Sequence, residues 1–468
     1  MNLAIFKWVI YSRPAYEVST AIASGGYHLS RLLPMRSFVW IFLTLARIQL
    51  EIGFNTEQLA YSRKGLGNAG NFARLKKLEE RILRAVDLVR PEFQFHQHVG
   101  NLQTTVLFAA SFVYHVGGHT RLLQTYLSQL HGSRLYARFE RRGPLGAERQ
   151  GPNPATLFEG RTDLFISGRQ QFFLLKRQVQ DTYRTFQSLS PACIVMFNQT
   201  VDLGLLLAAI LYSRQNPQVP VIYYHHADDY FPFLCGAFEC HIDIDANQDA
   251  KCRHIRNREL IRISVRDRFP EVSQFSEGLC ETAFTVFSFV HMGKIVDSAG
   301  RSPYVELVAR ICKMGFHVVL ATNVGSASLL SEKLATVGCD MSLITIDEAC
   351  LDIAKYAGKI HVCLDTFPVG GGMSVIDGLS MRLPVIIHDA PRHQIFRDNN
   401  LAHWMFVDEP GICSYLSRLS QDGKFYADEA ESAYAIFKQY YSQEVMSAAL
   451  LSVVSKVVRS RERDRASD

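Results

Sequence analysis

The segment Leu364–Asp377 (LDTFPVGGGMSVID) decides the fold of the second half of this 468-residue chain. The apolar run from Ile360 to Leu364 predicts a buried strand, the three glycines at 370–372 predict a loop, and a helix is predicted to begin near Met373 or Ser374. Because glycine lacks a β-carbon, the backbone of such a loop can come close to a ligand. A helix N-terminus adds unpaired N–H groups and about half a positive charge, which favour phosphate.

The polar side chains of this segment suit a nucleotide. Asp377 lies three residues beyond Ser374, on the same face of the predicted helix and one turn from its start. We expect the N–H groups and the Ser374 hydroxyl to bind a diphosphate and Asp377 to bind ribose hydroxyls. The residues predicted to bind this nucleotide are Asp365, Gly370, Gly371, Gly372, Met373, Ser374 and Asp377. The alternative is a glycine-rich turn whose Asp merely complements the helix dipole.

Composition describes a cytoplasmic protein with real hydrophobic cores, since 48% of the residues are apolar. No secretory leader is expected, and the longest apolar run, Phe38–Ala46, is far shorter than the roughly 20 residues that span a bilayer. The ten cysteines lie between Cys193 and Cys413, and none forms a C-x-x-C pair. This pattern predicts reduced, mostly buried thiols and no disulfide framework.

The net charge of +5 conceals an asymmetry between the two parts of the chain. Residues 1–180 hold 23 Lys and Arg against 11 Asp and Glu, so residues 181–468 are net acidic. The basic part favours an anionic partner, such as an anionic membrane surface or a phosphorylated glycan, although solvated helix faces also explain it. No zinc-finger, RNP or recognition-helix motif is present, so we expect no nucleic-acid partner.

Residues 1–100 are predicted to form a helical extension. Apolar residues recur at helical spacing from Ala73 to Val89, with Lys and Arg between them. The segment Met35–Leu50 predicts either a buried helix, which we favour, or a helix on a membrane surface.

Residues 101–270 are predicted to form a first Rossmann-like α/β domain. Strands alternate with helices here, which is typical of βαβ units and a parallel sheet. The predicted strands are Thr105–Tyr114, Arg134–Phe139, Cys193–Phe197, Val219–Tyr224 and His241–Asp245, with helices up to Leu130 and over Val201–Tyr212.

Residues 271–440 are predicted to form a second such domain, after a linker over Leu260–Glu281. The predicted strands are Ala283–Phe289, His317–Ala321, Ser342–Ile346, His361–Leu364 and Pro384–His388, with helices over Tyr304–Met314 and Leu351–Ala357. Two open α/β units predict a cleft lined by the carboxyl ends of their strands. Residues 441–468 are predicted to be a closing helix followed by a disordered tail from Arg459.

Two loops that follow first strands carry further candidates. Lys294 follows the first strand of the second unit and would offer a flexible point charge to a diphosphate. In the first unit Gly117 and Gly118 precede His119, a candidate general base, and Arg121, a candidate anion contact.

The segment after Tyr224 carries two more candidate catalytic residues, His226 and Asp228, which could orient an acceptor hydroxyl and accept its proton. A metal is not expected, because the spacings of the nearby His and Cys residues match no standard zinc pattern. The D-x-D sequence Asp243–Asp245 is interpreted as strand-end polarity.

Taken together, the paired α/β units, the G-G-H loop and the D-T-F-P…G-G…S…D segment resemble glycosyltransferases of the GT-B fold, over roughly residues 105–410. The nearest resemblance is to the branch of O-linked N-acetylglucosamine transferase and its bacterial relatives. That branch has a Lys after the first strand of the C-terminal unit, where Lys294 stands, and hydroxyl residues and an Asp where Ser374 and Asp377 stand. Its usual His-Thr-Thr is Gly372-Met373-Ser374 here, and its tetratricopeptide array is absent.

The resemblance implies a bacterial hexosyl- or N-acetylhexosaminyl-transferase that uses a nucleoside diphosphate sugar, with a UDP-sugar expected. It also implies that residues 101–270 bind the acceptor and residues 271–440 the donor. The acceptor could be a glycan, a lipid-linked saccharide or a protein. No cofactor or metal is expected, and the lack of a Glu-x7-Glu pair favours inversion. The alternatives are a nucleotide-sugar 2-epimerase of the same fold and a non-catalytic nucleotide-sugar or glycan-binding protein.

Overall fold

The fold is taken from a computed structural model of the chain. It describes residues 36–55, 69–93, 106–111, 118–138, 158, 164–167, 175–198, 202–225, 231–244, 257–262, 264, 265, 267, 283–297, 300–322, 325–348, 353–370, 372–389 and 399–467.

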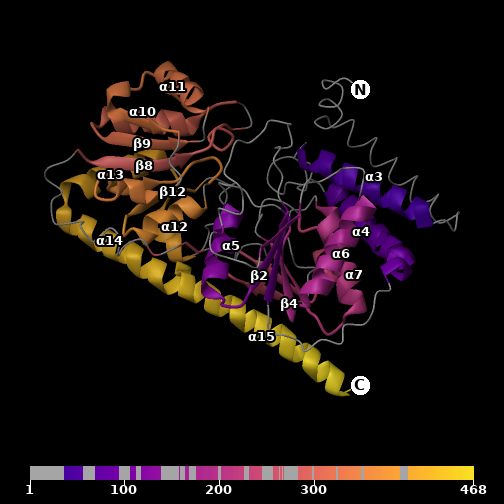
Figure 1. Cartoon of the computed structure of the whole chain (residues 1–468). Helices are drawn as coiled ribbons and strands as arrows, with labels where there is room; N and C mark the ends of the chain where they lie inside the picture. The colour runs from indigo at the N-terminus through magenta and orange to yellow at the C-terminus, as the bar shows by residue number, and fades with distance from the viewer. Residues whose placement is uncertain are drawn as a thin grey trace. The chain divides into compact units, whose positions relative to one another are not determined.

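The chain forms two compact units. Unit 1 comprises residues 1–243, 251–260 and 450–468, and unit 2 comprises residues 244–250 and 261–449. Each unit is built on one parallel sheet flanked by helices (Figure 1), so the predicted pair of α/β units is confirmed.

Unit 1 contains a seven-stranded sheet with the order β3-β2-β1-β4-β5-β6-β7. Its strands are β1 (Val106–Ala110), β2 (Arg134–Arg138), β3 (Leu164–Ser167), β4 (Cys193–Phe197), β5 (Val221–His225), β6 (Cys240–Asp243) and β7 (Arg258–Leu260). All neighbouring strands among these are parallel. The order reverses between β1 and β4, which makes the carboxyl ends of these two strands the switch point of the sheet.

Helices cover both faces of the unit 1 sheet. They are α3 (Arg36–Asn55), α4 (Ala69–Val89), α5 (Gly118–Gln129), α6 (Leu175–Leu189) and α7 (Leu203–Gln215). In Figure 1, α6 and α7 lie on one face and α5 on the other. On the α5 side, Tyr126 stacks on Phe108 of β1 at 5.8 Å and meets Tyr224 of β5 edge-on.

The predicted N-terminal helices share the core of unit 1. Phe42, Leu43 and Ala46 of α3 are fully buried in the same hydrophobic cluster as α4, α6 and α7. Arg47, also buried, donates to Gln178 Oε1 of α6 at 2.7 Å. The buried reading of this segment is therefore confirmed. Within the described part of the chain, no helix is both long and apolar enough to cross a bilayer.

Unit 2 contains a six-stranded parallel sheet with the order β10-β9-β8-β11-β12-β13. Its strands are β8 (Thr285–Val290), β9 (His317–Thr322), β10 (Ile344–Asp347), β11 (Val362–Leu364), β12 (Val385–His388) and β13 (Met405–Phe406). The order reverses between β8 and β11, so the switch point lies at the carboxyl ends of these two strands.

The helices of unit 2 also divide between two faces. They are α10 (Pro303–Lys313), α11 (Ala327–Thr336), α12 (Met373–Ser380), α13 (Glu409–Gln421) and α14 (Gly423–Ile436). Helices α10, α11 and α13 share one apolar cluster with β8, β9 and β11. Helix α12 packs on β11 through Gly378, where a β-carbon would lie 2.8 Å from Cys363 Cβ.

Helix α15 (Gln443–Ser467) closes the chain and contributes residues to both units. In unit 1, Val453 and Val454 are buried, Lys456 pairs with Glu259, and Arg461 pairs with Glu239. These contacts hold the segment in a helix to Ser467, whereas the sequence predicted disorder from Arg459.

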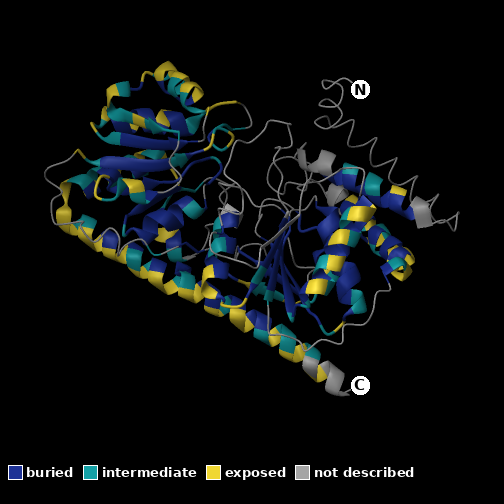
Figure 2. Cartoon of the chain, in the orientation of Figure 1, coloured by how far each residue is buried: buried dark blue, intermediate teal, exposed yellow. Residues whose placement is uncertain are grey.

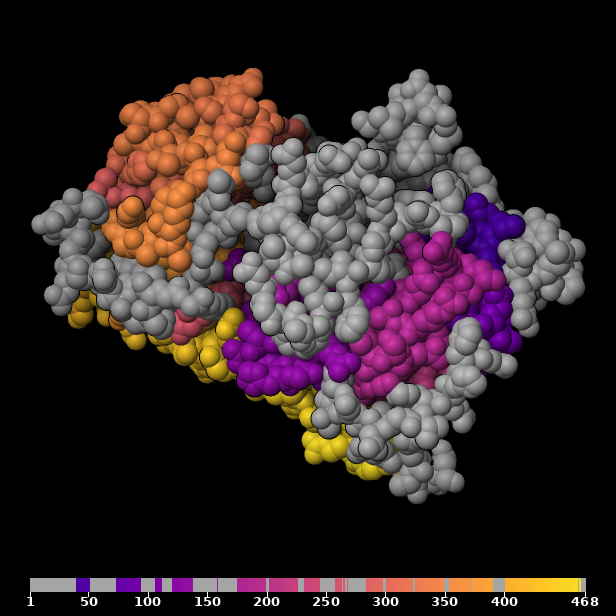
Figure 3. All heavy atoms as spheres, viewed as in Figure 1, coloured from indigo at the N-terminus to yellow at the C-terminus, as the bar shows by residue number. Residues whose placement is uncertain are grey.

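Most predicted strands of the described chain are present within one to two residues of their expected ends, and the predicted helix at 351–357 is only a 3₁₀ turn over Ile353–Tyr356. Strands β3, β7 and β13 were not predicted, and no bounds were predicted for helices α6 and α11. Figure 2 shows both sheets largely buried, and in Figure 3 the outer side of α6 contributes to the magenta surface of unit 1.

Candidate functional site

The switch point of unit 2 brings Lys294 and the glycine loop together. Lys294 follows β8, and its Nζ donates to Gly370 O at 2.8 Å. The backbone N–H of Val369, in the same loop, donates a hydrogen bond to Lys294 O at 3.1 Å. An ammonium group has three hydrogens, so the contact with Gly370 leaves two for a ligand.

Helix α12 begins at this loop with a glycine as its N-cap. Gly372 has φ 63° and ψ −90°, a conformation that only glycine adopts readily, and no side chain caps the helix. The N–H groups of the first turn are therefore not taken up by a capping side chain. Gly371 lies outside the described residues.

Helix α11 of the same unit has the opposite arrangement. Its first N–H, that of Ala327, donates to Glu348 Oε1 at 2.6 Å. A carboxylate of the protein itself already stabilises this positive helix end. Of these two helices, only α12 presents an N-terminus that no protein side chain caps.

The loop between β11 and α12 is stabilised by apolar and polar contacts. Thr366 Oγ1 donates to Val369 O at 2.9 Å. The Phe367 ring stacks on His388 at 4.2 Å and meets Tyr304 edge-on at 5.7 Å. Burial lowers the pKa of His388, which favours the neutral ring at neutral pH.

Two carboxylates lie beneath the start of α12. Asp365 Oδ1 accepts a hydrogen bond from Ser374 Oγ at 3.1 Å, and Asp365 is only 1% exposed. Asp377 is likewise 1% exposed. Burial raises the pKa of the Cys363 thiol well above its usual value, and the nearby carboxylates of Asp365 and Asp377 raise it further. Both acids therefore lie close to one buried thiol, which is not a nucleophile.

The switch point of unit 1 holds a polar pair that the sequence did not reveal. Ser111 follows β1 and donates to Asn198 Oδ1, after β4, at 2.9 Å in a buried position. The two strands pair from Val106↔Cys193 to Ala110↔Phe197, and this register places their carboxyl ends together. The two residues are 87 positions apart, so their contact could be predicted only from the register in which β1 and β4 pair.

The predicted acceptor residues are placed in part. Gly118 and His119 lie in the first turn of α5, and Arg121 in the same helix is half-buried. The side chain of His119 lies outside the described residues, as do Gly117, His226 and Asp228. Their roles remain predictions.

A buried ionic cluster occupies the carboxyl ends of β5 and β6. Asp243 Oδ1 receives His225 Nδ1 and His241 Nε2, each at 3.0 Å, and Asp243 Oδ2 pairs with Arg258 of β7. Burial alone would raise the pKa of Asp243, but the hydrogen bonds from both histidines outweigh it and lower the pKa. Burial lowers the pKa of His241, against a smaller opposing effect of Asp243.

The side chains of His225, His241 and Asp243 are the group of described residues close enough to share a metal ion. The charges argue against one. Arg258 already balances Asp243, so a divalent ion would leave two uncompensated positive charges in a buried place. The cluster fits a hydrogen-bonded network of two imidazoles, a carboxylate and a guanidinium.

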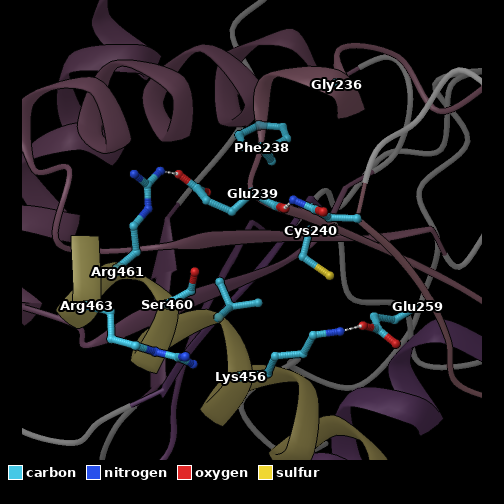
Figure 4. A pocket seen from close by; sticks show the side chains of 11 residues that line it. Gly236, Phe238, Glu239, Cys240, Glu259, Lys456, Ser460, Arg461 and Arg463 are labelled. Atoms are coloured by element: carbon cyan, nitrogen blue, oxygen red, sulfur yellow. Dashed lines mark hydrogen bonds and ion pairs between the residues drawn. The ribbon is translucent and has the colours of Figure 1, made fainter.

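A pocket of about 760 Å³ lies elsewhere in unit 1, between α15 and the amino-terminal ends of β6 and β7 (Figure 4). The ion pairs Lys456–Glu259 and Arg461–Glu239 cross it. Burial raises the pKa of the Cys240 thiol in its wall to about 12, so this thiol is unreactive. Ligands of open parallel sheets bind at the carboxyl ends of the strands, so this pocket is not the candidate site.

Comparison with known proteins places the fold. No protein-family model and no curated protein sequence matches the chain. Among solved structures, a glycosyltransferase from Rickettsia africae has a TM-score of 0.58 at 11% identity, covering 76% of this chain and 99% of its own. HepE from Anabaena in complex with UDP-glucose has a TM-score of 0.55 at 12% identity, covering 76% and 100%.

A third structure extends the match over nearly the whole chain. A mutant of the O-GlcNAc transferase of Thermobaculum terrenum has a TM-score of 0.50 at 13% identity, covering 95% of this chain and 85% of its own. The chain therefore has the α/β architecture of the GT-B glycosyltransferases, as its sequence predicted. At these identities the likeness concerns the fold alone.

Proposed function

We propose that the protein is a glycosyltransferase that moves a sugar from a nucleoside diphosphate donor to a glycan, a lipid-linked saccharide or a protein. The observation that carries this proposal is the pairing of Lys294 with the glycine loop at the uncapped start of α12. An ammonium group and a helix N-terminus converge there on one place at the switch point of unit 2. Together they suit the two negative charges of a diphosphate.

The reaction follows from that electrostatic arrangement. An acceptor oxygen or amide nitrogen attacks the anomeric carbon, the bond from that carbon to the diphosphate breaks, and the acceptor proton passes to a base. Negative charge grows on the leaving diphosphate, where Lys294 and the N–H groups of α12 stabilise it. We propose that no metal takes part, since both groups are supplied by the protein. We also propose inversion, which the lack of a Glu-x7-Glu pair favours.

The acceptor side of the proposal rests on unit 1. We propose His119, His226 or Asp228 as the base and the Gly117–Gly118 turn with Arg121 as the anion or acceptor contact. The basic N-terminal part keeps a peripheral contact with an anionic membrane as a prediction. A cytoplasmic location follows from the same proposal, because nucleotide sugars would have to reach the donor site.

A UDP-sugar is the proposed donor, supported by the UDP-glucose bound to the structurally similar HepE. The test is a thermal-shift screen of UDP-, GDP-, CDP- and TDP-sugars on the wild type, Lys294→Ala and Lys359→Ala. Lys359 is an exposed lysine that precedes β11, at the opposite end of this strand. A UDP-sugar should stabilise the wild type and Lys359→Ala but shift Lys294→Ala much less. A screen in which no nucleotide sugar raises the melting temperature would remove the donor site.

The same donor distinguishes the two alternatives. An epimerase would isomerise the UDP-sugar without any acceptor, which nuclear magnetic resonance would detect. A binding protein would be stabilised by the donor without turning it over in the presence of any acceptor tested.

A further inference from the structure

The hydroxyl of Ser374 already uses its only hydrogen. Ser374 Oγ lies 3.1 Å from Asp365 Oδ1, and an ionised carboxylate can only accept, so the serine is the donor. Both residues are buried, Ser374 at 5% and Asp365 at 1% exposure. Phosphate oxygens at neutral pH are acceptors as well. While this bond persists, Ser374 Oγ has only lone pairs to offer and cannot donate to a diphosphate.

The charge of Asp365 points the same way. A phosphate oxygen held by Ser374 Oγ would lie about 6 Å from the carboxylate. Like charges at that distance repel by roughly 3 kcal/mol at an effective dielectric constant of 20. The diphosphate is therefore better placed towards Lys294, on the side of the loop where Gly370 O meets Nζ.

We propose that the Ser374 hydroxyl, held by Asp365, accepts a hydrogen bond from a ribose hydroxyl of the donor nucleotide. The diphosphate is then bound by Lys294 and the first N–H groups of α12. This assignment rests on the proposed nucleotide-sugar function and changes the role that the sequence suggested for Ser374. It makes Asp365 a positioning residue, since it fixes the direction of the serine hydrogen.

A ribose fits this place because it presents two neighbouring hydroxyl donors to a group of acceptors. Asp377 lies one helical turn beyond Ser374, on the same face of α12. Asp365, Ser374 and Asp377 all approach Cys363: Ser374 O accepts from the Cys363 thiol at 3.5 Å, and the two carboxylates perturb that thiol. Acceptors that lie on one face of the first turns of a short helix suit a diol better than a second anion.

The test is calorimetric titration of UDP, 2′-deoxy-UDP, 3′-deoxy-UDP and inorganic pyrophosphate into the wild type, Ser374→Ala and Ser380→Ala. Ser380 is the matched control, a buried serine of the same helix that bonds only to its own helix, at Asp377 O. Ser374→Ala should weaken UDP about 5- to 20-fold, the loss expected for one buried hydrogen bond. Its affinity for pyrophosphate should stay within twofold, and the loss should vanish for one of the two deoxy analogues.

Two further variants separate the contact from a folding defect. Ser374→Thr keeps the hydroxyl and should retain the affinity for UDP. Asp365→Asn removes the repelling charge and should bind pyrophosphate at least as tightly as the wild type. Equal weakening of pyrophosphate and UDP by Ser374→Ala would overturn the assignment, as would no weakening of either ligand or an equal loss for both deoxy analogues. Failure of the wild type to bind UDP at all would instead contradict the proposed function.

Discussion

The sheets of the two units have the same strand order around their switch points, but the polar groups along their carboxyl edges differ in charge. In unit 2, a lysine and an uncapped helix end leave positive charge for a ligand. At the carboxyl edge of unit 1, Ser111 bonds to Asn198, and two histidines and an arginine contact Asp243. One edge is prepared for an anion that comes from outside. In the described cluster around Asp243 at the other edge, the charge of the carboxylate is already balanced by Arg258.

The largest effect that would test this contrast is the loss of Lys294. We expect Lys294→Ala to lower turnover about 10²- to 10³-fold, the range for removing one preorganised group from a developing charge. Lys359→Ala should leave turnover unchanged, and Arg121→Ala should affect donor affinity less than Lys294→Ala affects turnover. Steady-state kinetics with a UDP-sugar measure all three. Equal effects of Lys294→Ala and Arg121→Ala on donor binding would mean that the two halves are wrongly assigned.

Substitutions in the cluster of His225, His241, Asp243 and Arg258 should instead lower the stability of the protein. Asp243→Asn leaves Arg258 without its carboxylate in a largely buried place, so we expect a loss of about 3 kcal/mol in the free energy of unfolding. The control Asp181→Asn removes an exposed carboxylate beside Arg177 and Arg184 and should cost less than about 0.5 kcal/mol. Urea unfolding measures both. A strong loss of UDP affinity in well-folded Asp243→Asn would mean that the donor site is wrongly assigned to unit 2.

The open helix end in unit 2 depends on Gly372. Any other residue at φ 63° and ψ −90° is strained by roughly 1–3 kcal/mol, so Gly372→Ala should lower stability and weaken UDP binding together. Gly358→Ala is the matched control. Gly358 also has a positive φ, of 72°, so an alanine there is strained, but its β-carbon would meet nothing within 4 Å. This control should lower stability without changing UDP affinity. Unchanged UDP affinity in Gly372→Ala would separate the loop from the donor.

Mildly acidic pH should lower the stability that the cluster of His225, His241 and Asp243 contributes. Since burial lowers the pKa of His241 below 6.5, the unfolded chain binds the proton more readily and stability falls as the pH drops below 6.5. The lowered pKa of Asp243 adds a further loss below about pH 4. Unfolding curves between pH 7 and 5 should show a shallower slope for His241→Gln than for the wild type. An identical slope would mean that His241 is not held neutral by the fold.

The smallest expected effect is that of a chelator. Because Arg258 already neutralises Asp243, EDTA should not change the melting temperature. Because Lys294 and α12 are proposed to stabilise the leaving group without a metal, EDTA should not change turnover either. A fall in either on EDTA treatment, restored by a divalent ion, would show that the cluster of His225, His241 and Asp243 binds metal after all.

The parts of the site that are local in sequence were predictable. The strand, loop and helix around residues 360–380 follow from apolar runs and glycines, and α12 begins at Met373 as expected. The meeting of Lys294 with that loop followed from both lying after strands of one predicted sheet. Helix α6 carried a detectable helical pattern in Leu175, Val179, Tyr183 and Phe186, all buried, which the prediction overlooked.

The contacts that depend on register were beyond prediction. His225 and Asp243 meet because β5 and β6 pair with these residues opposite each other, and the sequence does not specify that alignment. The direction of the Ser374 hydrogen is a similar case. It depends on how deeply Asp365 is buried beside α12, so a hydroxyl first assigned to phosphate becomes an acceptor once its neighbour is known.

Under the proposed function, the contact of Gly378 with Cys363 means that donor affinity can be tuned from the interior of the protein. With only 2.8 Å for a β-carbon, even an alanine at 378 would push α12 off β11 and move the start of the helix relative to Lys294. Conversely, a smaller residue at 363 would let the helix settle deeper. Laboratory evolution for a different donor would therefore be expected to find useful changes at this core position, which no ligand touches.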